Sequence, residues 1–212
     1  MKKISSEEFR NISRDAKVME EDKFGKKVLL LSDGTYLKLF RIKRLLSSAR
    51  IYSYAKRFAN NAKRLTQLGI PTVKIKDLYR IPHLSRTAVH YYPLEGVTLR
   101  SLPNTLSKDT AEKLGRFIGE LHDKGIYFRS LHLGNIVITP YGQMGLIDIS
   151  DVSFHYSSLS KRKRLRNFHH TFHPEDTMAI TPNFDSFLGA YTQTNDLYKE
   201  IRSLWRTTNR TS

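Results

Sequence analysis

The chain of 212 residues contains no cysteine. This absence excludes disulfide-stapled scaffolds, thiolate metal sites and cysteine nucleophiles. The sequence also lacks an uninterrupted run of 18 apolar residues, and no apolar stretch follows the basic start Met1–Lys3. We therefore expect neither a membrane-spanning helix nor a signal peptide, and we expect a cytoplasmic protein.

Acidic residues are scarce: 20 Asp and Glu stand against 36 Lys and Arg, a formal net charge of +16. From Lys38 to Arg86 there are 13 basic residues and one acid, Asp77. A second basic run covers Lys161–Arg166. Unless these runs are simply solvated surface, they predict an anionic partner, such as a nucleotide, a phosphorylated sugar, an acidic membrane face or nucleic acid. No nucleic-acid-binding motif accompanies them, so nucleic acid is supported by charge alone.

The first third of the chain has the apolar patterns of strands and one helix. Asp33-Gly34 joins two apolar runs, which predicts a β-hairpin whose second strand carries Lys38 on one face with Tyr36 and Phe40. Apolar residues at helical spacing predict a helix that Gly69 ends. The expected elements are strands Lys27–Ser32 and Thr35–Phe40, a helix Ser47–Leu68, strands Val73–Ile81 and Thr87–Tyr92, and a connector Pro93–Gly96.

Beyond the connector the patterns become helical. Ser107 is a candidate cap of a helix that ends near Gly125, and Pro140–Gln143 predicts the turn of a small hairpin. The expected elements are the helix that starts after Ser107, a loop Phe128–Asn135, hairpin strands Ile136–Thr139 and Met144–Ile147, a basic helix Leu159–Phe172 and a last helix Phe184–Trp205.

The segment HDKGIYFRSLHLGNIVITPYGQMGLIDISD, residues 122–151, resembles the catalytic and metal loops of bacterial lipopolysaccharide-core kinases, the Kdo and heptose kinase family. The resemblance implies an α+β, protein-kinase-like two-lobed fold in one domain over 1–212. A small strand-rich N-lobe would cover 1–93 and a reduced helical C-lobe 94–212. It further implies an ATP- and Mg²⁺-dependent phosphotransferase acting on a sugar hydroxyl of the lipopolysaccharide core or another anionic glycolipid, with peripheral contact at the inner face of the inner membrane.

The resemblance assigns roles to single residues. Lys38 matches the strand lysine that contacts nucleotide phosphates, the alternative being a surface lysine. Asn135 and Asp148 match the magnesium ligands, the alternative being a turn asparagine and a strand-end aspartate. Asp151 is either a second acidic ligand or a turn cap.

Two positions depart from an active kinase. Ser130 occupies the place of the catalytic aspartate, and a neutral hydroxyl is no proton acceptor at neutral pH. His132 is the nearby titratable group and is either a substitute base or structural. Ser130 and His132 are therefore the candidate catalytic residues.

The helix glutamate that should pair with Lys38 is also missing, because Asp77 is the only acid between Lys38 and Glu95. Asn61, on the apolar stripe of the predicted helix, is the best replacement unless it bonds locally. Lys38, Asn61 and Glu95 are the candidate nucleotide-contacting residues. Protein kinases have a loop with three glycines that covers the nucleotide phosphates, and the corresponding segment of this sequence has one glycine, Gly25. These departures leave two alternatives open: a pseudokinase that binds nucleotide or phosphate and regulates envelope assembly, and, third, a basic nucleic-acid-binding protein.

Overall fold

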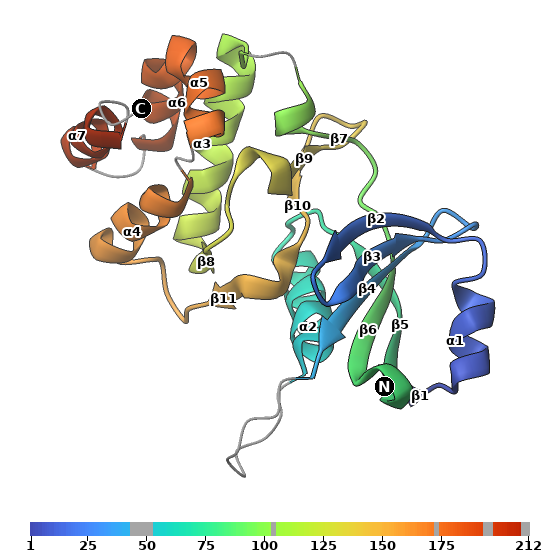
Figure 1. Ribbon diagram of the computed structural model, residues 1–212. Coiled ribbons are helices and arrows are strands. Elements are labelled where there is room, and N and C mark those ends of the chain that lie inside the picture. Colours follow the sequence, from blue (N-terminus) through green and yellow to red (C-terminus); the bar gives the residue numbers. More distant parts are fainter. Residues whose placement is uncertain (43–52, 103–104, 172–173, 193–196, 209–212) are drawn as a thin grey trace. The chain divides into compact units, whose positions relative to one another are not determined.

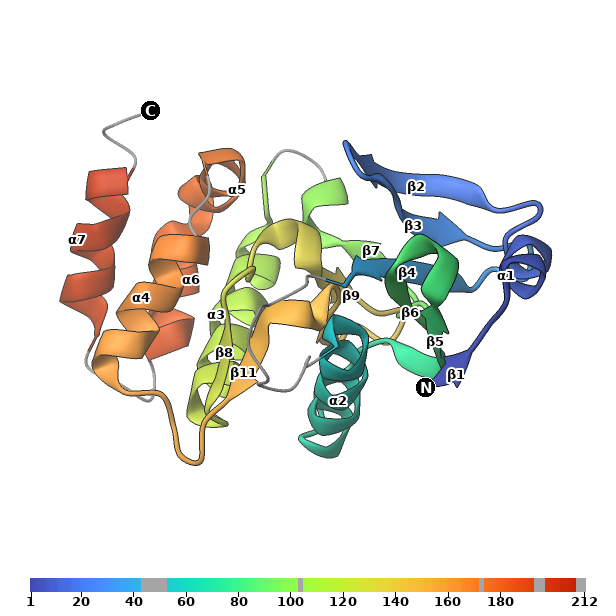
Figure 2. The same cartoon turned by 60° about the horizontal axis from the view of Figure 1, so that its bottom comes forward.

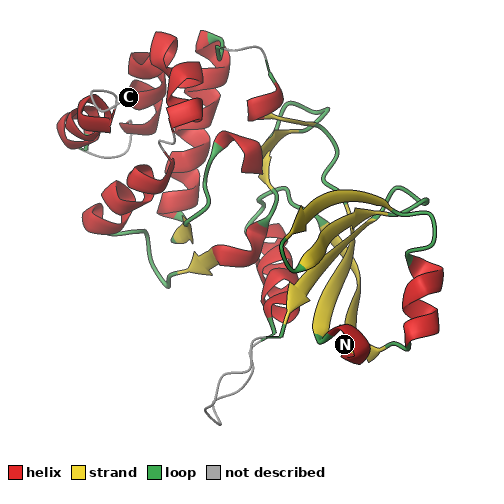
Figure 3. Cartoon of the chain, viewed as in Figure 1, coloured by secondary structure: helices red, strands yellow, loops and turns green. Residues whose placement is uncertain are grey.

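The computed structural model describes residues 1–42, 53–102, 105–171, 174–192 and 197–208, and the chain divides into two compact units, Met1–Leu94 and Glu95–Ser212 (Figure 1). The fold is mixed α+β. Figure 3 shows a strand-rich sheet in the first unit and several helices with short strands in the second. Within the described ranges, no helix has both the length and the apolar character needed to cross a membrane.

The first unit is built on a six-stranded sheet of order β1-β5-β6-β4-β3-β2. Its strands are β1 Lys2–Lys3, β2 Lys17–Asp22, β3 Gly25–Leu30, β4 Tyr36–Arg41, β5 Lys74–Ile81 and β6 Arg86–Tyr92. β1 runs parallel to β5 and the other pairs are antiparallel. The predicted hairpin is confirmed as β3–β4: Gly34 adopts φ 77°, and the Asp33 carboxylate accepts a hydrogen bond from the Thr35 amide at 3.0 Å.

The two faces of this sheet pack against different helices. One face carries the apolar cluster that includes Leu37 and Leu39, and Phe9 of helix α1 (Ser6–Ile12) packs against it. The opposite face of β4 carries Tyr36, Lys38 and Phe40, because side chains alternate along a strand. Helix α2 (Tyr54–Gln67) covers that face, with the Phe58 ring 6.2 Å from Phe40 and 5.4 Å from Tyr91. The predicted start of this helix at Ser47 lies outside the described residues.

The second unit combines short strands with five α-helices in the described ranges. A three-stranded sheet has the order β10-β9-β7, and β8 pairs with β11. The strands are β7 Val97–Thr98, β8 Ile126–Phe128, β9 Ile136–Ile138, β10 Met144–Leu146 and β11 Val152–Phe154. The helices are α3 Lys108–Asp123, α4 Lys161–Thr171, α5 Pro174–Ile180, α6 Phe184–Tyr191 and α7 Tyr198–Thr208. Several 3₁₀ turns, among them η2 Leu99–Ser101, η3 Leu133–Asn135 and η4 Ile149–Asp151, connect them.

Helix α3 crosses α6 at close range, as Figures 1 and 2 show. The predicted cap of α3 is confirmed, since Ser107 Oγ accepts a hydrogen bond from the Thr110 amide at 3.2 Å. A Cβ on Gly115 would stand 2.2 Å from the Phe187 carbonyl oxygen of α6. The absence of a side chain at Gly115 is therefore what allows the two backbones to approach.

The prediction of one last helix over Phe184–Trp205 is wrong. The chain forms α6 and α7 as separate helices, and α5 precedes them without having been predicted. Thr192 follows the last residue of α6, and threonine favours helix ends over helix interiors. The hydroxyl of Thr192 donates to the Leu188 carbonyl at 2.8 Å, where α6 ends.

Candidate functional site

Asn135 and Asp148 lie at the same end of the β9–β10 hairpin. Ile136 pairs with Leu146 across this hairpin, so residues 135 and 147 flank the last pair. The Ile147 amide donates to the Asn135 carbonyl at 3.0 Å, which extends the ladder by one bond. Two residues thirteen positions apart in the sequence are thereby brought close together.

The amide of Asn135 is oriented by its neighbours. Its Nδ2 donates to the Ser130 carbonyl at 2.9 Å and lies 3.1 Å from His132 Nε2. The side chain is buried, with the residue 8% exposed. Because Nδ2 donates to the Ser130 carbonyl, Oδ1 is the atom that can serve as a cation ligand.

Asp148 adopts a left-handed backbone, with φ 49° and ψ 47°. Only a few non-glycine residues take this conformation, aspartate among the more tolerant, and such strain gathers at functional sites. The residue is exposed, and the Ile147–Asn135 bond holds the preceding residue in place.

The donor set fits Mg²⁺ if other oxygens complete the coordination. An amide oxygen and a carboxylate are hard ligands, and Mg²⁺ commonly takes one or two protein ligands together with phosphate oxygens and water. In the described part of the chain, no group of three or more His, Cys, Asp or Glu side chains forms a metal site. Asn135 and Asp148 would therefore hold the ion only together with a phosphate-bearing ligand.

Ser130 is hydrogen-bonded to a carboxylate from a distant segment. Phe128 of β8 pairs with Val152 of β11, so the residues that follow β8 meet those that precede β11. Ser130 Oγ donates to Asp151 Oδ2 at 2.5 Å, and Arg129 Nε lies 3.7 Å from the same oxygen. A carboxylate thus lies beside Ser130, the residue that the resemblance aligns with a catalytic aspartate.

A buried carboxylate, paired with an exposed arginine, fixes the loop that contains His132. Asp176 of α5 is 1% exposed and accepts a hydrogen bond from the Leu133 amide at 2.8 Å. Arg100 of η2 donates to both Asp176 oxygens, at 3.0 and 3.1 Å, and its Nη2 lies 3.5 Å from His132 Nδ1. A Cβ on Gly134 would lie 3.2 Å from the His132 ring, so glycine leaves room for it.

Sequence reasoning missed Asp176 and Arg100. Neither belongs to the segment 122–151 that carries the resemblance, and α5 was not predicted. A single aspartate followed by threonine in PEDTMAI gives no sign of its partner 76 residues earlier. Only the tertiary structure connects the two side chains.

A second buried network holds the strand that leads into the loop. His122 Nδ1 lies 2.9 Å from the Tyr191 hydroxyl, and His122 Nε2 lies 3.1 Å from Asn167 Oδ1. Asn167 Nδ2 donates to the Phe128 carbonyl at 2.8 Å. Burial lowers the pKa of His122 to about 4 and raises the pKa of Tyr191 to about 12, so both are neutral at pH 7.

The candidate residues of the first unit share one interface. Lys38 is 9% exposed on the sheet face that α2 covers, and Asn61 lies on the buried face of α2 beside Phe58 and Leu65. The burial of Lys38 does not agree with its alternative interpretation as a surface lysine. Glu95 is exposed and is the first residue of the second unit.

Arg86 of β6 makes hydrogen bonds to the β2–β3 turn. In protein kinases the corresponding turn is the glycine-rich loop that covers the nucleotide phosphates. The guanidinium of Arg86, a residue 8% exposed, donates to the carbonyls of Phe24 and Lys26, the latter at 2.9 Å. The Arg41 guanidinium lies over the Phe24 ring at 3.6 Å. Gly25, with φ 97°, supplies the one left-handed residue of this turn.

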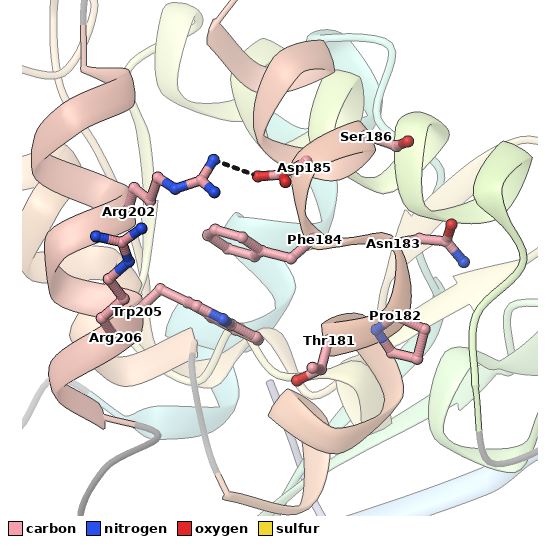
Figure 4. Close-up of a pocket in the computed structure, with 9 residues that line it drawn as sticks. All are labelled: Thr181, Pro182, Asn183, Phe184, Asp185, Ser186, Arg202, Trp205 and Arg206. Atoms are coloured by element: carbon pink, nitrogen blue, oxygen red, sulfur yellow. Dashed lines mark hydrogen bonds and ion pairs between the residues drawn. The ribbon is translucent and has the colours of Figure 1, made fainter.

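A separate pocket of about 340 Å³ opens between the segment Thr181–Asn183, α6 and α7 (Figure 4). The rings of Phe184 and Trp205 stack on one side of it at 4.2 Å, and Arg202 donates to Asp185 at 2.6 Å. None of the predicted site residues lines it. Its polar groups form a surface ion pair and include no nucleophile paired with a base.

Comparison of the chain with known family models and with curated proteins finds no match in either. The interpretation of the site therefore depends on its geometry and on the motif in residues 122–151.

Proposed function

We propose that the protein is an ATP- and Mg²⁺-dependent phosphotransferase with a protein-kinase-like two-lobed fold. Its proposed substrate is a sugar hydroxyl of the lipopolysaccharide inner core or of another anionic glycolipid. The observation that carries the proposal is the placement of Asn135 and Asp148 at one end of the β9–β10 hairpin, where the Ile147 amide binds the Asn135 carbonyl. Phosphoryl transfer depends mainly on positioned phosphates and charge neutralisation, and this pair is suited to both.

Each residue then has a defined task. Mg²⁺, when bound, neutralises charge on the β- and γ-phosphates. Asn135 Oδ1 and the Asp148 carboxylate hold the ion, and Lys38 contacts phosphate oxygens. Because the ring of His132 lies beside Asn135 Nδ2 and Arg100 Nη2, we assign it to orienting the Asn135 amide rather than to accepting a proton.

The charge of the chain supports an acidic acceptor. A net charge of +16 attracts phosphorylated glycolipids, and each basic residue near an anionic membrane surface contributes about 1 kcal/mol of attraction. Peripheral contact with the inner face of the inner membrane is part of the proposal.

The test is thermal unfolding with and without ATP and Mg²⁺, for the wild type and Asp148→Asn. Asparagine tolerates the left-handed backbone, so this variant removes the charge and little else. At a hundredfold excess over Kd, ligand binding stabilises the fold by about 2.7 kcal/mol, which raises Tm by roughly 5–10 °C. We expect the wild type to show this rise and Asp148→Asn to lose most of it.

The matched control is Asp109→Asn, an exposed carboxylate in the first turn of α3. It should keep the full rise in Tm, and EDTA should abolish the part that needs the metal. A wild type with no rise under these conditions contradicts the proposal.

A pseudokinase that senses nucleotide or phosphate and regulates envelope assembly is the second candidate. Ser130 in place of the catalytic aspartate and Asn61 in place of the helix glutamate favour it. Phosphate transfer to dephosphorylated core oligosaccharide separates the two, since the pseudokinase would show the rise in Tm without transfer. Nucleic-acid binding is supported by charge alone and predicts tight binding to oligonucleotides without any effect of Asp148→Asn.

A further inference from the structure

We infer that Ser130 and Asp151 act together as the proton-accepting unit that replaces the aspartate absent from position 130. The inference rests on the proposed phosphotransferase function. It assigns Ser130 to contact with the acceptor hydroxyl and Asp151 to a role exerted through Ser130.

The β8–β11 ladder brings the two residues together. Phe128 pairs with Val152, which sets Asp151 against the two residues that follow β8. Ser130 Oγ donates its hydrogen to Asp151 Oδ2 at 2.5 Å, a length typical of a hydroxyl bonded to a carboxylate. A serine hydroxyl has one hydrogen and two acceptor lone pairs. With its hydrogen given to Asp151, the oxygen of Ser130 presents lone pairs to the hydroxyl of an acceptor.

The surroundings of Asp151 do not match a turn cap. A capping carboxylate accepts backbone amides, and in the described residues neither oxygen of Asp151 does so. Oδ1 is buried without a hydrogen-bond partner in the same ranges, and Arg129 Nε stands 3.7 Å from Oδ2. The described contacts of this carboxylate are thus directed at the two residues Arg129 and Ser130 of the catalytic loop.

The chemistry balances without a further reactant. The acceptor oxygen forms a bond to the γ-phosphorus of ATP, and the bond from that phosphorus to the β,γ-bridging oxygen breaks, so ADP leaves with the electron pair. The acceptor proton passes to Ser130 Oγ while the Ser130 proton passes to Asp151 Oδ2. Asp151 then releases the proton to water, and the pair returns to its starting state.

The experiment measures kcat for phosphate transfer from ATP to dephosphorylated lipopolysaccharide core oligosaccharide, and separately the Kd for ATP with Mg²⁺. Asp151→Asn and Ser130→Ala should each lower kcat by about 10² to 10⁴. The Kd for ATP should stay within about twofold, since neither side chain is a metal ligand in the proposed function. Asp109→Asn, with its carboxylate on α3, should keep wild-type values.

A swap of the two residues gives the sharper test. Ser130→Asp alone sets two carboxylates at hydrogen-bond distance, and their repulsion should keep kcat low. The double variant Ser130→Asp/Asp151→Ser returns one carboxylate and one hydroxyl to the pair, and its kcat should recover to within about tenfold of the wild type. Recovery in the double variant shows that the pair needs one carboxylate, and the loss of kcat in Asp151→Asn is what assigns that carboxylate to Asp151 in the wild type.

Several results would overturn the inference. These are wild-type activity in Asp151→Asn, an activity of Ser130→Asp above that of the wild type, and a double variant no better than Ser130→Asp. If Asp151→Asn fails to fold, Ser130→Ala decides, because a serine that takes no part in proton transfer would leave kcat at the wild-type value. A wild type that binds ATP but transfers no phosphate overturns this inference alone, whereas a wild type that binds no ATP overturns the proposed function as well.

Discussion

The sheet of the first unit and the loop from Phe128 to Asn135 hold their backbones by different means. In the sheet, strand pairs with strand, and backbone groups bond to one another. In the loop, a few turn bonds between backbone groups are supplemented by side chains: Asn167 donates to the Phe128 carbonyl, Asn135 donates to the Ser130 carbonyl, and Asp176 accepts from the Leu133 amide. Irregular backbone that is buried still needs hydrogen-bond partners. Removal of a single side chain should therefore disturb the backbone of the loop more than the backbone of the sheet.

The largest effect should come from Asp176→Ala. This change leaves the Leu133 amide without its acceptor and Arg100 without its carboxylate. We expect the free energy of unfolding to fall by about 3–4 kcal/mol, measured by urea denaturation, because the Leu133 amide and the Arg100 guanidinium both lose a charged hydrogen-bond acceptor. Asp185→Asn breaks the more exposed ion pair with Arg202 and should cost less than about 1 kcal/mol. If the two variants lose the same free energy of unfolding, the side chains that hold the loop contribute no more to stability than an exposed ion pair does.

The second effect is a pH dependence from His122. Its pKa of about 4 in the fold lies below the ordinary value of 6.5, so the unfolded chain takes up a proton at higher pH than the folded one. The stability that the neutral ring contributes is complete above pH 6.5 and is lost as the pH falls toward 4, on the order of 3 kcal/mol in total. His122→Gln should flatten this part of the stability curve, while His83→Gln, at an exposed histidine, should leave it unchanged. A wild-type curve that is flat between pH 4 and 6.5 would contradict this assignment.

Replacement of two glycines of α3 by alanine should have different effects on stability, and both effects should be smaller than the two above. A Cβ on Gly115 would meet the Phe187 carbonyl at 2.2 Å, so Gly115→Ala should cost about 2 kcal/mol through displacement of α6. A Cβ on Gly119 would find its nearest neighbour at 3.6 Å, an ordinary contact. Gly119→Ala should therefore be neutral or stabilising by up to about 1 kcal/mol, because alanine favours a helix. Thermal unfolding of both variants checks the pair, and equal Tm values would show that the crossing is looser than described.

The smallest effect should be found in the sheet. Ile81→Val removes one methylene from a fully buried position of β5 and should cost about 1 kcal/mol. Under the proposed function, the Kd for ATP and Mg²⁺ should not change in this variant, since the backbone ladder keeps its register. A large loss of nucleotide affinity in this variant would show that the sheet is as sensitive to one side chain as the loop is.

Many of the regular elements could be predicted from the sequence because their signals are local, whereas the short helices α1 and α5 and the exposed strand β2 were not predicted. Asp33-Gly34 specified a hairpin, and Ser107 specified the start of α3. The spacing of apolar residues identified α3 and the β9–β10 hairpin within a few residues. The prediction of one helix from Phe184 to Trp205 was wrong because apolar residues at helical spacing occur on both sides of a short polar segment.

The site could be predicted only where a motif supplied it. Asn135 and Asp148 were proposed from the resemblance of residues 122–151, and the hairpin brings them to one end of its ladder. The bond between Ser130 and Asp151 depends on the β8–β11 register, and the contact of Asp176 with Arg100 depends on an unpredicted helix. Pairings of this kind join segments 21 and 76 residues apart, and no local pattern encodes them.

The two hydrogen bonds from Arg86 to the β2–β3 turn affect how this turn can recognise another molecule. Both carbonyls that Arg86 holds belong to the tip of the hairpin, so the tip has its shape before anything contacts it. A molecule that docks there meets a preorganised surface, and the entropy loss that ordering a flexible glycine loop would require is avoided. Selectivity at the tip would then arise from fit to a fixed template rather than from adaptation.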